Sequence, residues 1–63
     1  MSITGIEVEL IGHDGNAYAI LGKVQKEMKR AGFVEEAKQY LAEATAGGYD
    51  NLLAVTMKYV EVV

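Results

Sequence analysis

Near the start of the chain, apolar and acidic residues alternate. The alternating residues are Ile6, Glu7, Val8, Glu9 and Leu10. A period of two is typical of a strand with one face buried and the other in water. The pattern predicts a first strand over residues 3 to 11.

A polar turn follows this strand. Gly12 and Gly15 permit backbone angles that other residues resist, and the short side chains of Asp14 and Asn16 can bond nearby amides. We expect Asn16 to cap the N-terminus of a helix, with Asp14 as the alternative cap.

From residue 17 the apolar positions follow i, i+3, i+4, i+7 spacing, which predicts an amphipathic helix of about four turns. These positions are Ala17, Ile20, Leu21, Val24, Met28 and Ala31. Gly32 is expected to end the helix in the left-handed conformation, after a basic last turn that suits the helix dipole. Gly22 lies inside the helix and costs about 1 kcal/mol relative to alanine. The simplest compensation is close approach of another backbone.

Two further helices are predicted. The first runs from about Val34 to Ala46 and ends at Gly47-Gly48, with one apolar stripe. The residues of that stripe are Val34, Ala37, Leu41 and Ala44. Asp50 is the expected N-cap of a third, shorter helix. The apolar residues assigned to that helix are Leu52, Leu53, Val55, Met57 and Tyr59.

The C-terminal residues 59 to 63 are rich in β-formers and alternate loosely, which predicts a closing strand. The alternative is continuation of the third helix through Val60.

These elements predict an α+β fold: one small β-α-α-α-β domain over residues 1 to 63. The two terminal strands pair, because a lone strand cannot satisfy its own backbone, and three short helices cover one face of the pair. Parallel and antiparallel pairing both remain open. Each strand leaves an open edge, guarded by Glu7, Glu9 and Glu61, and self-association of two copies would cover such edges or the apolar surface.

Composition narrows the class of protein. Apolar residues make up 51% and charged residues 24% of 63 residues, values typical of a globular protein. No apolar run approaches the roughly 20 residues of a membrane helix, so no membrane contact is expected. The chain has no cysteine, and its first four residues lack the character of a secretory signal. We expect a cytoplasmic protein.

The turn and two later segments resemble a family of short, uncharacterised bacterial and phage- or plasmid-borne proteins. The resemblance lies in Gly12-His13-Asp14-Gly15-Asn16-Ala17, in Ile20-Leu21-Gly22 and in Tyr49-Asp50-Asn51-Leu52-Leu53. It covers nearly the whole chain and implies no activity. Members of that family tend to carry a small polar residue where this chain has His13, which argues against a catalytic role for His13.

The residues that could form a catalytic, metal or phosphate site lie in or near the same turn. His13 beside Asp14 has the composition of a general base oriented by a carboxylate, but the chain has no second histidine and no cysteine, and no motif places a nucleophile. With Glu7 and Glu9 these residues make at best a weak site for a hard cation. Gly12 and Gly15 lie between a strand and a helix as in a phosphate loop, but the P-loop and dinucleotide patterns are absent. We expect no enzyme activity, no metal and no cofactor.

The net charge of −3 argues against a general polyanion binder. Four of the six basic residues nevertheless fall within eight positions of the first helix. They are Lys23, Lys26, Lys29 and Arg30. They are candidate nucleic-acid contacts, although lysines near a helix C-terminus also suit the helix dipole without any ligand.

Tyrosine is enriched at protein interfaces, and the chain has four tyrosines against one phenylalanine. Tyr18, Tyr40 and Tyr59 are the candidate interface residues. The leading hypothesis is a small, non-catalytic interaction or accessory protein that binds an unidentified protein or a second copy of itself. The alternative is a weak nucleic-acid-binding module that uses the basic side of the first helix.

Overall fold

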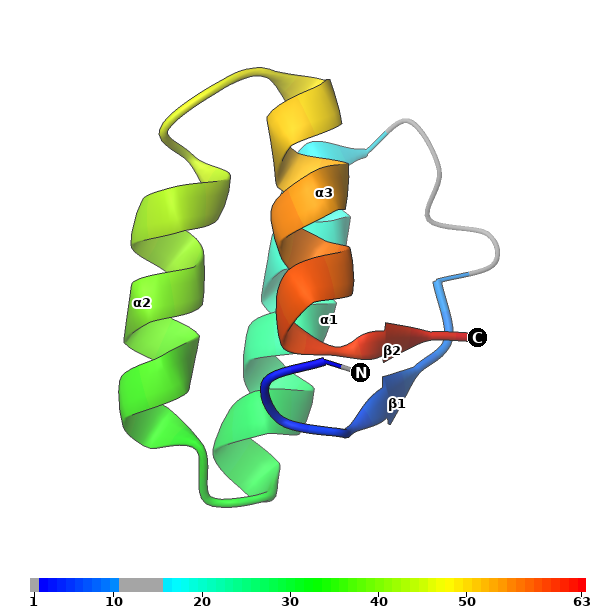
Figure 1. The fold of residues 1–63 in the computed structure, drawn as a ribbon, viewed down its shortest axis with the longest axis vertical. Coiled ribbons are helices and arrows are strands. Elements are labelled where there is room, and N and C mark those ends of the chain that lie inside the picture. The colour runs from blue at the N-terminus through cyan, green and yellow to red at the C-terminus, as the bar shows by residue number, and fades with distance from the viewer. Residues whose placement is uncertain (1, 11–15) are drawn as a thin grey trace.

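The computed structural model describes residues 2–10 and 16–63 and confirms the β-α-α-α-β order (Figure 1). The elements are β1 (Glu7–Val8), α1 (Ala17–Arg30), α2 (Val34–Ala44), α3 (Tyr49–Tyr59) and β2 (Glu61–Val62). In Figure 1, α2 and α3 lie in front, α1 lies behind α3, and the two strands lie side by side near both chain ends. Among the described residues, no helix is long and apolar enough to cross a membrane.

The two strands pair in parallel, which settles the direction that the sequence left open. Glu7 lies opposite Glu61, and Val8 lies opposite Val62. The Glu61 N–H donates to the Ile6 carbonyl at 2.7 Å, and the Val63 N–H donates to the Val8 carbonyl at 3.0 Å. A parallel pair needs a long crossover, and here the three helices supply it.

The first strand is shorter than the predicted span of residues 3 to 11, of which residue 11 lies outside the described part. The Ile3 N–H donates to the Lys58 carbonyl at 2.9 Å, and the Thr4 N–H donates to the Tyr59 carbonyl at 3.0 Å. The last carbonyls of a helix have no partner within the helix. Residues 3 and 4 therefore cap the end of α3, and Gly5, with a φ of 71°, turns the chain into β1.

Both ends of α1 follow the prediction. The Asn16 side chain accepts a hydrogen bond from the Ala19 N–H at 3.1 Å, which confirms it as the N-cap; Asp14 lies outside the described residues. Gly32 has a φ of 94°, as expected. Its N–H donates to Lys29 O, and the Phe33 N–H donates to Met28 O at 2.8 Å, the two bonds of a Schellman motif.

The expected backbone neighbour of Gly22 is not present in the described structure. Gly22 is exposed, and a Cβ built on it meets no atom within 4 Å. The prediction of close packing at Gly22 is therefore wrong. Nothing within the described part of the domain offsets the conformational cost of this glycine.

Replacing Gly22 with alanine should consequently stabilise the protein by about 0.5–1 kcal/mol, because alanine restricts the unfolded chain and fits the helix without strain. Chemical denaturation followed by far-UV circular dichroism measures this change. A loss of stability in the Gly22→Ala variant would contradict the open environment described for this position.

The other helix boundaries differ slightly from the prediction. The α2 helix ends at Ala44, two residues early, and the Thr45 hydroxyl donates to the Leu41 carbonyl at 2.7 Å. Asp50 is not the N-cap of α3: that position belongs to Gly48, and Asp50 lies in the first turn. Val60 is extended, with φ −134° and ψ 162°, so continuation of α3 through Val60 is also wrong.

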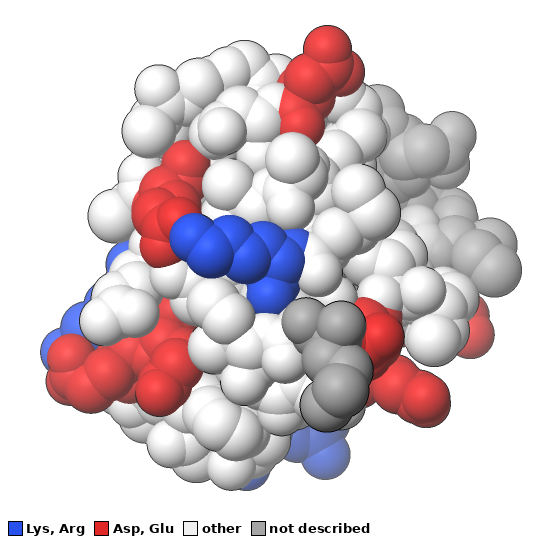
Figure 2. Space-filling model, viewed as in Figure 1, with Lys and Arg blue, Asp and Glu red and all other residues white. Residues whose placement is uncertain are grey.

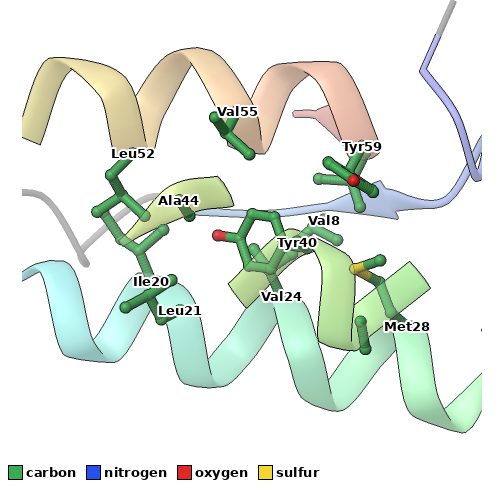
Figure 3. Close-up of a cluster of buried hydrophobic side chains, with 12 residues drawn as sticks. Val8, Ile20, Leu21, Val24, Met28, Tyr40, Ala44, Leu52, Val55 and Tyr59 are labelled. Atoms are coloured by element: carbon green, nitrogen blue, oxygen red, sulfur yellow. The ribbon is translucent and has the colours of Figure 1, made fainter. Parts of the chain in front are cut away.

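One core joins the three helices to β1 (Figure 3). On α2, the buried positions are Ala37, Tyr40 and Ala44, whereas the predicted Leu41 is 39% exposed. On α3, Thr56 is buried and the predicted Met57 is exposed. The residues of the core are Val8, Ile20, Leu21, Val24, Met28, Ala37, Tyr40, Ala44, Leu52, Val55, Tyr59 and Val60.

Candidate interaction surface

The outward side of α1 carries most of the basic residues. Lys26, Lys29 and Arg30 are exposed, and Lys23 is half-buried at the edge of the same side. Gly22 lies one turn and Tyr18 two turns before Lys26, and residues four apart on a helix lie on one side of it. We call this surface the α1 face and define it by Tyr18, Gly22, Lys26, Lys29 and Arg30.

The cations of the α1 face are weakly paired. Arg30 lies 3.7 Å from the Glu27 carboxylate, and its side chain is 70% exposed. Ion pairs at such exposure contribute little to stability. Within the described part of the chain, Lys23, Lys26 and Lys29 form no ion pair. Their charges are therefore directed to solvent or to a partner.

The acidic residues lie mostly outside α1. Figure 2 shows the face formed by α2 and α3: acidic side chains are spread over it, a basic side chain crosses its middle, and other basic groups appear at its margins. By sequence, α1 holds four basic residues and one acidic residue, a charge of +3. The rest of the chain holds two basic and eight acidic residues, a charge of −6. Most basic residues therefore lie on α1, whereas the rest of the chain carries a net negative charge.

The structure separates the three candidate tyrosines. Tyr18 is 87% exposed, whereas Tyr40 is 0% and Tyr59 is 2% exposed. Tyr40 and Tyr59 are therefore not exposed for contact with a partner. Both rings fill the core because each hydroxyl has an internal partner, which removes the cost of burying it. Tyr18 alone of the three is placed to meet a partner.

The two buried hydroxyls belong to separate networks. The Tyr40 hydroxyl lies 2.8 Å from Thr56 Oγ1, which donates to the Leu52 carbonyl at 2.8 Å. The Tyr59 hydroxyl donates to a carboxylate oxygen of Glu43. Lys58 Nζ donates to the other Glu43 oxygen at 2.7 Å.

Burial and these hydrogen bonds shift the pKa values of Tyr40, Tyr59 and Glu43. Burial raises the pKa of Tyr40, and its hydrogen bond with Thr56 partly offsets the effect. Burial, followed by the hydrogen bond and charge of Glu43, raises the pKa of Tyr59 from 10.0 to about 12. The hydrogen bond from Lys58, and then that from Tyr59, lowers the pKa of Glu43.

The Tyr59 shift predicts alkaline sensitivity. A folded pKa above the unfolded value means that the stabilisation is complete below pH 10 and is lost as the pH rises from 10 towards 12. We expect the free energy of unfolding to fall across this range and to fall less steeply in a Tyr59→Phe variant. Urea titrations at a series of pH values measure both slopes. Equal slopes in the two proteins would contradict the account of Tyr59.

The predicted chemistry of the turn falls largely on residues that are not described. His13, Asp14, Gly12 and Gly15 lie outside the described residues. Glu7 lies in β1 and Glu9 follows it, and both are exposed. Among the described residues, no group of three or more His, Cys, Asp or Glu side chains gathers in a way that could hold a metal ion.

The structure adds a feature that the sequence did not predict. An open pocket of about 280 Å³ lies where the first turn of α1 meets the connection between α2 and α3. Its lining residues are Ala17, Tyr18, Leu21, Ala44, Thr45, Gly47, Gly48, Tyr49 and Leu52. The one signal in the sequence was Gly47-Gly48, a pair without side chains between two apolar helices.

Comparison with protein-family models, curated proteins and solved structures finds no match to this chain.

Proposed function

We propose that this chain is a small, non-catalytic interaction protein that binds an acidic protein surface through the α1 face. The observation that carries the proposal is the uneven distribution of charge along the chain: +3 on α1 and −6 on the rest. Complementary charge steers association and fixes orientation. The absence of cysteine agrees with a role in the cytoplasm, as the composition suggested.

The side chains of the α1 face support this role. Tyr18 offers a large, 87% exposed aromatic ring, and aromatic and arginine side chains are typical anchors of protein interfaces. Gly22 leaves a flat position one turn further along α1. A partner can approach the helix backbone there, and such an approach would account for a glycine that is otherwise unfavourable inside a helix.

A photocrosslinking experiment tests the proposal. The photoreactive amino acid p-benzoylphenylalanine replaces Tyr18 in one variant and Met57 in another, and both proteins are expressed in the native host. Met57 is the control because it is also exposed, at 61%, but lies on α3. We expect a discrete adduct with another protein from position 18 and none from position 57. Adducts of equal yield from both positions, or none from position 18, would contradict the proposal.

A second copy of the chain is the other protein partner to consider, since the acidic residues outside α1 could meet the α1 face of a neighbour. Analytical ultracentrifugation at low and high salt distinguishes the cases. Association that weakens with salt and is lost when Lys26, Lys29 and Arg30 become glutamine would identify the partner as a second copy. A monomer at every concentration leaves a different protein as the partner.

Nucleic acid is a second candidate, favoured by one observation: Lys26 and Lys29 are exposed on one side of α1 without an ion pair in the described structure. Phosphate contacts of this kind are strongly salt-dependent. Titration of labelled DNA and RNA at low salt, with the triple glutamine variant as control, decides between the candidates. The −6 charge outside α1 favours a compact acidic protein surface over an extended polyanion.

A further inference from the structure

On one side of the pocket beside Tyr18, hydrogen bonds and close packing hold the α2–α3 connection in place. Asn51 Nδ2 donates to the Glu43 carbonyl at 2.8 Å and approaches the Ala44 carbonyl at 3.5 Å, which ties the start of α3 to the end of α2. A Cβ on Gly47 would lie 2.8 Å from the Cβ of Asn51, so the connection accepts no side chain at Gly47 without movement. The side of the opening formed by the α2–α3 connection is thus held by local packing.

The pocket is lined mainly by apolar groups. Leu21 and Leu52 are 8% and 3% exposed and belong to the hydrophobic core, so the pocket gives access to the margin of that core. The Thr45 hydroxyl donates to Leu41. Among the residues that the structure describes, no charged side chain lines the pocket. A volume of 280 Å³ is at the lower limit for small-molecule sites and suits one or two apolar side chains.

Tyr18 connects this pocket to the basic residues. It lines the pocket and also begins the α1 face, and Lys26 lies two helical turns further on, about 12 Å along the axis. A ligand that places an apolar side chain between Leu21 and Leu52 and continues along α1 therefore passes over Lys26, Lys29 and Arg30. Carboxylates on that ligand would match their charges.

We infer that the pocket receives an apolar anchor side chain from an acidic segment of the partner protein, with the carboxylates of that segment lying along the α1 face. This inference rests on the proposed function and specifies the partner's chemistry. An apolar anchor in a preformed pocket supplies binding energy, and the flanking charges supply orientation.

Nuclear magnetic resonance of the ¹⁵N-labelled full chain tests this inference with three short acetylated peptides. The first carries one leucine followed by a run of glutamates. In the second peptide serine replaces the leucine, and in the third peptide glutamines replace the glutamates. We expect the first peptide to shift the amides of Leu21, Gly48 and Leu52 together with those of Lys26 and Lys29. Loss of the leucine should weaken binding about tenfold or more, and loss of the glutamates should weaken it at low salt.

Two leucine variants of the protein test the pocket from the other side, one at the pocket and one away from it as a matched control. Gly48 lines the pocket and has no atom within 4 Å of an added Cβ, so Gly48→Leu should fold and reduce the space open to a ligand side chain there. Met57→Leu places an exposed leucine on α3 instead. The first variant should lose the leucine-dependent binding, and the second should retain it.

The outcomes separate the two proposals. Equal binding of the leucine and serine peptides, with shifts confined to Lys26 and Lys29, would overturn the pocket and leave the α1 face as the contact surface. Equal binding of the glutamate and glutamine peptides would overturn the acidic character of the ligand. An absence of shifts in Leu21, Gly48 and Leu52 with every peptide would overturn the pocket, while crosslinking from position 18 still tests the proposed function independently.

Discussion

Replacing Tyr40 with alanine is expected to unfold most of the protein at room temperature. The ring is fully buried between α1 and α3, and it meets the Tyr59 ring edge-on with centroids 5.7 Å apart (Figure 3). Removing a buried aromatic ring costs about 3–5 kcal/mol. A core of this size rarely supplies more than about 3–5 kcal/mol in total. Circular dichroism and one-dimensional proton spectra report the loss of folded protein.

Two further tyrosine variants make this result interpretable. Tyr40→Phe keeps the ring and removes only the hydroxyl, and Thr56 Oγ1 still donates to Leu52, so we expect a loss of about 1 kcal/mol. Tyr18→Ala removes an 87% exposed ring and should change stability by less than about 0.5 kcal/mol. Similar stability of the two alanine variants would show that Tyr40 is not a core residue.

Replacing Val8 with aspartate is expected to have an effect of similar size. Val8 is 1% exposed and is the one fully buried side chain of β1. A carboxylate placed there would be surrounded by apolar side chains and would lose its hydration without gaining a cation. We expect a loss of about 3 kcal/mol or more, which leaves little folded protein at neutral pH.

The sheet itself offers the control. Val62 lies opposite Val8 in register but is 43% exposed, so Val62→Asp introduces the same charge on the other member of the pair. We expect Val62→Asp to cost less than about 1 kcal/mol. Urea denaturation compares the two variants. Equal losses would mean that the helices do not cover β1 as described.

The fold class could be predicted from sequence because the strongest local signals agree with the final packing. Alternation around Val8, the Asn16 cap and the left-handed Gly32 each fix one junction, and each is confirmed. The failures occur where a tertiary contact decides the outcome. Residues 3 and 4 bond to the end of α3 instead of extending β1, and no local pattern reports the position of those carbonyls.

The candidate surface was predicted only in part, for a related reason. Helical periodicity correctly separated Lys26, Lys29 and Arg30 from the apolar side of α1. On α2, the apolar residues at helical spacing placed Leu41 in the core, whereas Tyr40 is the buried residue. That prediction failed because Thr56, sixteen residues away, satisfies the Tyr40 hydroxyl. The pocket could not be predicted, since two segments far apart in the sequence, residues 17–21 and 44–52, form it.

The central claim of this fold is the parallel pairing of the two chain ends. Scalar couplings across hydrogen bonds, measured by nuclear magnetic resonance in a sample labelled with ¹³C and ¹⁵N, test this pairing most directly. We predict couplings from the Glu61 nitrogen to the Ile6 carbonyl carbon and from the Val63 nitrogen to the Val8 carbonyl carbon. The Val62 amide should exchange rapidly with solvent, because alternate amides of a strand point to opposite sides. Couplings from Glu61 or Val63 to other carbonyls, or exchange at those amides as fast as at Val62, would contradict the pairing.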